Sequence, residues 1–154
     1  MIILGVDPGS KRVGYGLLEK TGAKLNLLDA GLLEINKPLP LNLLEIESGL
    51  TGLIKKFRPE RMAIEKLFFM NNQKTGIEVS QARGVILLSA LKNKIKISEY
   101  APNEVKLAVS GYGLADKKAV EKMVKLILNK PDLKLIDDAV DALALAITGA
   151  SRLD

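Results

Sequence analysis

The sequence of 154 residues contains no cysteine, no histidine and no tryptophan. Without cysteine the chain can form no disulfide, thiolate nucleophile, cysteine-ligated zinc site or iron–sulfur cluster. Without histidine it has no imidazole base, no Ser-His-Asp triad and no imidazole metal ligand. Acid–base or metal chemistry must therefore use carboxylates, lysine, tyrosine or water. The oxygen ligands that remain favour Mg²⁺, Mn²⁺ or Ca²⁺ if a metal is bound.

Long apolar runs are also missing. No 18 consecutive residues are apolar, so no segment is expected to span a membrane. The first ten residues, MIILGVDPGS, have neither the basic start nor the apolar stretch of a signal peptide, and we expect a cytoplasmic protein. Its 47% hydrophobic and 27% charged residues are typical of a globular protein, and its length fits one domain over 1–154.

The net charge of +5 is concentrated in one segment of the chain. Residues 92–134 hold ten lysines and five acidic residues, whereas residues 135–154 hold four aspartates and one arginine. A basic segment therefore leads directly into an acidic cluster. Phosphate groups are attracted to the first and need a divalent cation to approach the second, which favours a polyanionic partner.

Hydrophobic patterning predicts an α/β domain. Strands are expected at 2–6, 13–19, 24–34, 62–64 and 95–100. Helices are expected at 41–57, 74–92, 103–109, 116–128 and 137–148. Short turns join the first three strands and predict a three-stranded antiparallel meander, and helical crossovers then lead to parallel strands. We expect a five-stranded mixed sheet flanked by helices.

Acidic residues stand where the first and fourth predicted strands end. Asp7 follows the apolar run 2–6 and Glu65 follows 62–64, and ligands of open sheets bind at the carboxyl ends of strands. Asp138 and Asp141 lie three residues apart near the start of the last predicted helix, so they share one face. That helix is otherwise apolar nearly all round, and carboxylates on a buried helix need partners.

Each acid also has a structural interpretation. Asp7 before Pro-Gly can make an Asx turn, and Glu65 beside Lys66 can form a solvated pair. Asp137 is interpreted as the N-cap of the last helix or as a partner of its positive end. Asp141 is harder to explain in this way, because it lies beyond the first turn of an apolar helix.

The functional interpretation is that the four carboxylates converge on one or two divalent cations. Two metal ions about 3.5–4 Å apart activate a water molecule and stabilise the leaving oxygen in phosphodiester cleavage. Three or four carboxylates largely neutralise two such ions. A chain without histidine has few other routes to hydrolysis.

Four ordered blocks of the sequence resemble the RuvC family of Holliday junction resolvases. The blocks are ILGVDPGS with GYG (3–10 and 14–16), AIEKLFF (63–69), QARGV (81–85), and DAVDALA with AIT (138–144 and 146–148). The resemblance implies a ribonuclease H-like fold and a homodimeric, Mg²⁺-dependent endonuclease of recombination and DNA repair. Such enzymes nick two opposing strands of four-way junction DNA symmetrically. The resemblance also allows a branch-migration partner of the RuvAB type.

The resemblance assigns roles to individual residues. The catalytic and metal-binding carboxylates fall on Asp7, Glu65, Asp138 and Asp141. Two Mg²⁺ ions are implied per active site, and Mn²⁺ can substitute. By the same resemblance, Lys106 and Lys117 contact DNA phosphates and Phe68 stacks on bases. With the arginine of QARGV, the expected DNA-binding residues are Phe68, Lys106, Lys117 and Arg83.

Several alternatives stay open at this point. Some family members have histidine where Asp138 stands, and a shift of one residue would exchange its role with that of Asp137. Lys66 stands where family members commonly have glutamine, and its positive charge can either help or hinder the adjacent site. Phe69 can pack beneath its loop or at a dimer interface, and Lys117 can support its own helix through i, i+4 spacing with Glu121.

Other functions also fit parts of the pattern. A non-catalytic junction-binding module needs no metal, and a ribonuclease H-like nuclease can act on another nucleic acid. An actin/hexokinase-like phosphotransferase shares the Asp-x-Gly turn after a strand, but normally needs two such domains, which 154 residues do not supply.

Overall fold

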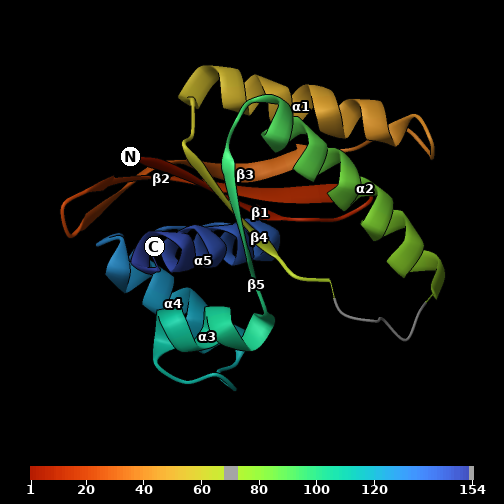
Figure 1. Ribbon diagram of the computed structural model, residues 1–154. Coiled ribbons are helices and arrows are strands. Elements are labelled where there is room, and N and C mark those ends of the chain that lie inside the picture. Colours follow the sequence, from red (N-terminus) through yellow and green to blue (C-terminus); the bar gives the residue numbers. More distant parts are fainter. Residues whose placement is uncertain (68–72, 153–154) are drawn as a thin grey trace.

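The computed structural model describes residues 1–67 and 73–152 (Figure 1). Within them the strands are β1 (Ile2–Asp7), β2 (Arg12–Thr21), β3 (Lys24–Glu34), β4 (Arg61–Glu65) and β5 (Lys96–Tyr100). They form one sheet in the order β3-β2-β1-β4-β5. The first three strands pair antiparallel, and β4 and β5 run parallel to β1. The predicted mixed sheet is therefore confirmed, including the pairing of the first and fourth strands.

Helices cover both faces of this sheet. They are α1 (Asn42–Phe57), α2 (Gln73–Lys92), α3 (Pro102–Ser110), α4 (Lys117–Ile127) and α5 (Asp137–Ser151). Figure 1 shows α1 and α2 on one face and α3, α4 and α5 on the other. None of the helices within 1–67 and 73–152 has both the length and the apolar character needed to cross a bilayer.

Strand alternation decides which face each acidic residue joins. Leu4 and Val6 of β1 belong to the apolar cluster beneath α1 and α2, whereas Ile3 belongs to the cluster around α5. Since successive side chains of a strand point to opposite faces, Asp7 shares the α5 face with Ile3. The same alternation in β4 places Glu65 on the face of Ala63, which packs in the α5 cluster.

Glycines in β1 and β2 allow α5 to lie directly on the sheet. A Cβ atom at Gly5 would overlap the Ala142 carbonyl oxygen, and one at Gly14 would overlap the Asp138 carbonyl oxygen. Gly14 is paired across the sheet with Asp7. The helix therefore approaches the sheet closely at the point where β1 ends, and its first two turns lie beside Asp7.

Candidate active site

The four predicted carboxylates come together at one end of the sheet. Val6 pairs with Ile64 across β1 and β4, so the residues that follow them, Asp7 and Glu65, leave adjacent parallel strands at the same edge. Asp138 and Asp141 approach this edge from the start of α5. The four acids therefore lie at one edge of the sheet, and their role as ligands of shared cations stays a prediction.

Burial, together with nearby charges, raises the pKa values of Asp7, Glu65 and Asp141. Burial raises the pKa of Asp7 from its ordinary value of 3.8 to about 7, and the nearby charges of Asp141, Glu65 and Asp138 add to the effect. Burial also raises the pKa of Glu65, and Asp141 raises it further. The pKa of Asp141 is raised by burial, although Lys117 opposes this. Carboxylates held together at such electrostatic cost are typical of functional sites.

Two lysines lie beside Glu65 and Asp141. Lys117, at the start of α4, has its Nζ atom 3.5 Å from Asp141 Oδ2 and 3.8 Å from Asp137 Oδ2. These partners raise the pKa of Lys117, Asp141 most strongly. Lys106 of α3 lowers the pKa of Glu65. Both lysines line a pocket of about 200 Å³ together with Glu65 and Asp141, so the basic segment 92–134 reaches the acidic site.

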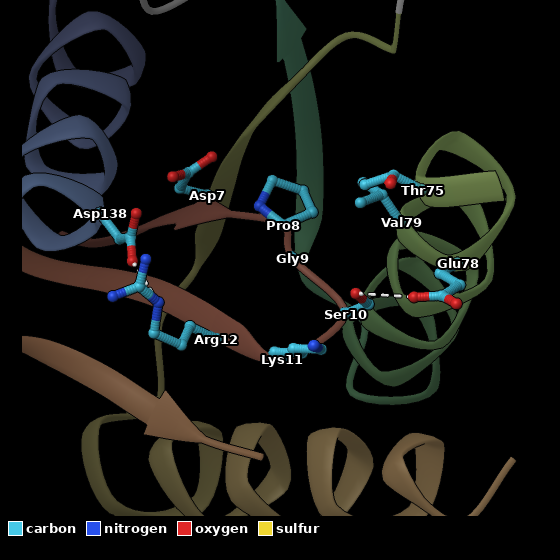
Figure 2. A pocket seen from close by; sticks show the side chains of 10 residues that line it. All are labelled: Asp7, Pro8, Gly9, Ser10, Lys11, Arg12, Thr75, Glu78, Val79 and Asp138. Carbon is cyan, nitrogen blue, oxygen red and sulfur yellow. Dashed lines mark hydrogen bonds and ion pairs between the residues drawn. The ribbon is translucent and has the colours of Figure 1, made fainter. Parts of the chain in front are cut away.

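A second pocket of about 570 Å³ adjoins the other two acids (Figure 2). Asp7 and Asp138 form one side of it, the turn from Pro8 to Arg12 forms its floor, and α2 closes the far side with Glu78 and Val79. Arg12 Nε lies 3.3 Å from Asp138 Oδ2, and the hydroxyl of Ser10 donates to Glu78 Oε2 at 3.3 Å. Sequence reasoning missed Arg12, although a basic residue close after the Asp7 turn was visible.

The oxygen donors of the site fit a hard divalent cation. All four side chains are carboxylates. Burial, with repulsion from the neighbouring acids, holds the pKa of Asp7 far above its ordinary range, and a bound cation would offset this cost. Among residues 1–67 and 73–152, no three acidic side chains are grouped closely enough to form a complete metal site. Arg12 pairs with Asp138 and Lys117 with Asp141, so each of these acids has a protein cation as its partner.

Asp138, and not Asp137, is the residue that faces Asp7. The side chain of Asp138 is 26% exposed, whereas that of Asp137 is 78% exposed and lies in the first turn of α5. The interpretation of Asp137 as the N-cap is wrong, because Ile136 holds that position. Its alternative interpretation, an acid near the positive end of the helix, is confirmed.

Lys66, Glu121 and Lys117 each pair with a residue other than the one considered from the sequence. Lys66 Nζ lies 3.9 Å from Glu104 Oε2, and no ion pair joins Glu65 to Lys66 within the described part of the chain. Glu121 pairs at i, i+4 spacing with Lys125 at 2.7 Å, whereas Lys117 pairs with Asp141.

The predicted DNA-binding residue Arg83 is bound within the protein, unlike the two lysines that line the pocket. Arg83 of α2 is only 12% exposed in its side chain. Its Nη2 pairs with Glu99 Oε2 at 2.6 Å, and its Nε donates to the Glu65 carbonyl oxygen at 3.2 Å. DNA contact by Arg83 stays a prediction, since its guanidinium is engaged within the protein. Phe68 and Phe69 lie outside the described residues.

Comparison with known proteins gives consistent matches over nearly the whole chain. A family model described as crossover junction endodeoxyribonuclease RuvC matches residues 3–149. The RuvC protein of Halothermothrix orenii is 49% identical over 151 residues, which cover 96% of this chain and 90% of that protein. The RuvC protein of Petrotoga mobilis is 47% identical over 148 residues, which cover 95% of this chain and 91% of that protein.

Solved structures agree with these sequence matches. The structure of T. thermophilus RuvC in complex with a Holliday junction substrate superposes with a TM-score of 0.90 at 31% identity, covering 97% of this chain and 93% of that one. A yeast mitochondrial Holliday junction resolvase superposes with a TM-score of 0.65 at 15% identity, covering 95% of this chain and 77% of that one, and shows a shared fold alone. The ribonuclease H-like fold expected from the sequence is confirmed.

Proposed function

Because the chain belongs to the RuvC family of crossover junction endodeoxyribonucleases, we propose that it resolves four-way DNA junctions by hydrolysing phosphodiester bonds. Relatives at 49% and 47% identity carry this name, and a structural relative is bound to a Holliday junction substrate. The observation that carries the proposal is the convergence of Asp7, Glu65, Asp138 and Asp141 at one end of the sheet, where burial and the charges of the other three acids raise the pKa of Asp7 to about 7. Residues 1–154 act as one nuclease domain.

The four carboxylates would hold Mg²⁺, two ions per active site, and Mn²⁺ would substitute for it. Bound in this way, divalent cations lower the pKa of water and stabilise negative charge on the phosphate oxygens. The partly buried carboxylate of Asp7 would provide an oxygen ligand, because it lies within the field of the other three acids. Glu65 stands on the Lys106 side of the site, and Asp138 stands on the Arg12 side.

Basic side chains of the protein orient the DNA backbone. Lys106 and Lys117 line the pocket that contains Glu65 and Asp141, so a phosphate bound there lies beside the acids. Lysine contacts to phosphate fix the position of a strand and carry no sequence information. Junction selectivity therefore comes from the geometry of the assembly and from bases held open near Phe68. Arg83 supports the end of β4 from within the protein and reaches DNA only if it leaves Glu99.

A homodimer provides two active sites for paired nicks, and one face of α2 supports this assembly. Ile77, Leu88 and Leu91 are 61%, 56% and 63% exposed and share a helical face with Gly84. A Cβ atom at Gly84 would meet no atom within 4 Å, so no internal contact requires a glycine there. A second helix can approach closely at such a position. A two-fold axis through this face relates two copies symmetrically.

The dimer can be tested by sedimentation equilibrium. Leu88→Glu places a charge in the centre of the exposed face and is expected to shift the protein to monomer. Leu114→Glu, at a 77% exposed position outside α2, is the matched control and is expected to leave the oligomeric state unchanged. A monomeric wild-type protein, or a dimer that survives Leu88→Glu, would remove α2 from the interface. Binding of a RuvAB-type complex is a separate proposal that depends on the same family membership.

Nicking of a labelled synthetic four-way junction tests the activity directly. Linear duplex and single strand serve as competing substrates, and each is incubated with Mg²⁺ and with chelator. We expect paired nicks in the junction alone and only with Mg²⁺. Glu65→Gln should abolish nicking, whereas Glu34→Gln, at an exposed acid at the end of β3, should not. Junction binding without any nicking would indicate a non-catalytic binding module, and cleavage of another substrate would indicate a different ribonuclease H-like nuclease.

A further inference from the structure

We propose that Arg12 is shared between Asp138 and the DNA: it pairs with Asp138 before a divalent cation binds, and contacts a backbone phosphate in the Arg12 pocket afterwards. The Arg12 pocket is the pocket of about 570 Å³ lined by residues 7–12, 75, 78, 79 and 138 (Figure 2). This inference rests on the proposed nuclease function and assigns to that site a second cationic contact, opposite Lys106 and Lys117.

The ion pair between Arg12 and Asp138 is easily exchanged. Arg12 Nε lies 3.3 Å from Asp138 Oδ2, and the arginine side chain is 65% exposed. Ion pairs between side chains as exposed as Arg12 stabilise a folded protein by at most about 1 kcal/mol. A competing ligand of Asp138 can therefore displace the arginine. A guanidinium carries five N–H donors, and its planar shape matches phosphate oxygens. Arg12 therefore has both the freedom and the donors to serve a second partner.

The acids lie between two pockets that each contain basic side chains. Asp7 and Asp138 line the Arg12 pocket, and Glu65 and Asp141 line the pocket of Lys106 and Lys117. A DNA strand whose phosphate sits over the acids must continue in both directions. On one side its next phosphates meet the lysines, and on the other side they enter the Arg12 pocket. The size of this pocket, about 570 Å³, is within the range of ordinary ligand sites.

Charge in the Arg12 pocket becomes more positive when the acids bind cations. Before that, the acids Asp7, Asp138 and Glu78 offset the charges of Lys11 and Arg12, so the pocket attracts phosphate little. Glu78 accepts a hydrogen bond from the Ser10 hydroxyl, which holds it at the far side on α2 (Figure 2). Divalent cations on Asp7 and Asp138 leave the two basic residues in excess and release the guanidinium. The pocket therefore attracts the DNA strand when divalent cations occupy the acidic site.

Competition for Asp138 gives two effects of opposite sign for one substitution. Arg12→Gln removes the protein cation from Asp138, so a divalent cation should bind more tightly in the absence of DNA. The same substitution removes a phosphate contact, so the junction should bind more weakly and with less dependence on salt. A residue that only stabilised the fold would lower both affinities, and a residue that only contacted DNA would leave metal affinity unchanged.

The test measures both affinities on the full chain. Mn²⁺ binding is followed by isothermal titration without DNA, and junction binding by fluorescence anisotropy at several salt concentrations with Ca²⁺ as the cation. For Arg12→Gln we expect Mn²⁺ affinity to rise about twofold to fivefold, the loss of an exposed ion pair expressed as a binding ratio. We expect the slope of log K against log salt to become shallower by about 0.9, the value for one phosphate contact.

Lys11→Gln is the matched control. Lys11 lines the same pocket and carries the same charge, but no ion pair joins it to Asp138 within the described structure. Its substitution should change Mn²⁺ affinity less than twofold. Arg12→Lys keeps the charge at the tested position and should keep most of the salt slope. It also provides a second measurement should Arg12→Gln unfold, which circular dichroism will show.

Three results would overturn the proposal: an unchanged Mn²⁺ affinity of Arg12→Gln, an unchanged salt slope, or the same rise in Mn²⁺ affinity for Lys11→Gln. Failure of the proposed function looks different, because the wild-type protein would then not nick a four-way junction. A wild-type protein that nicks junctions, with an Arg12→Gln variant unchanged in both affinities, would reject only the role of Arg12.

Discussion

Asp7→Asn should stabilise the metal-free protein at alkaline pH while abolishing nicking. Burial and three neighbouring carboxylates raise the pKa of Asp7 from 3.8 to about 7 in the folded state. Below pH 3.8 both the folded and the unfolded chain hold the proton, so Asp7 has no effect on stability there. Between pH 3.8 and 7 only the folded chain holds it, and the free energy of unfolding falls by about 1.4 kcal/mol for each pH unit.

The full loss is reached above pH 7, where Asp7 is ionised in both states. Over the whole shift it amounts to about 4 kcal/mol, of which about 3 kcal/mol develops above pH 5. Asparagine has nearly the same size and no charge, so the variant escapes this loss. We therefore expect the stability difference between Asp7→Asn and wild type to grow by about 3 kcal/mol between pH 5 and pH 8.5.

Urea unfolding in the presence of chelator measures this difference. Asp132→Asn, at an exposed position, removes one negative charge elsewhere and should change stability by less than about 0.5 kcal/mol at either pH. Added Mg²⁺ at pH 8.5 should stabilise the wild-type protein by about 2.7 kcal/mol at one hundred times the dissociation constant, and Asp7→Asn by much less. Junction binding by the variant should persist.

Parallel stability curves for wild type and Asp7→Asn from pH 5 to pH 8.5 would refute the reasoning. They would mean that neither burial nor the neighbouring carboxylates raise the pKa of Asp7 in the folded protein. Retained nicking by Asp7→Asn in Mg²⁺ would separately reject its role as a ligand.

Three further changes test other parts of the site. Gly14→Ala places a methyl group against the Asp138 carbonyl, so it should cost about 1–3 kcal/mol in urea unfolding and reduce nicking more than junction binding. Lys106→Ala should make the salt dependence of junction binding shallower by about one unit of slope, and an unchanged slope would show a solvated lysine. Arg83→Ala removes the charged hydrogen bonds to Glu99 and to the β4 end, and should lower stability by about 1–3 kcal/mol; a loss of junction affinity at unchanged stability would instead support direct DNA contact.

The positions of the strands and helices follow from local patterns, which is why the sequence predicts them well. The predicted strand 24–34 coincides with β3, and the apolar helix predicted at 137–148 is the start of α5, which continues to Ser151. Hydrophobic periodicity reports which faces are buried, and this depends only on residues close together in the chain. The end of a helix is less certain, because fraying and the capping of the last turn depend on contacts beyond the pattern.

The acidic site is also largely a property of the sequence. Asp7 and Glu65 each end an apolar strand, and strand alternation then sends both side chains to the face that α5 covers. The absence of histidine and cysteine leaves carboxylates as the main ligands for a metal. Glycines at 5 and 14 mark where the helix can lie against the sheet, a role that only the packed structure reveals.

Only the tertiary structure decided which charged residue pairs with which. Arg12 and Asp138 are far apart in sequence, yet the packing of α5 on β2 brings them to 3.3 Å. Lys117 pairs with Asp141 although helical spacing favoured Glu121, because the start of α4 lies beside α5. Surface charges have many partners of similar energy, so local pattern cannot choose among them. The sequence alone determined that the site consists of carboxylates, and the tertiary structure determined which basic side chains lie beside them.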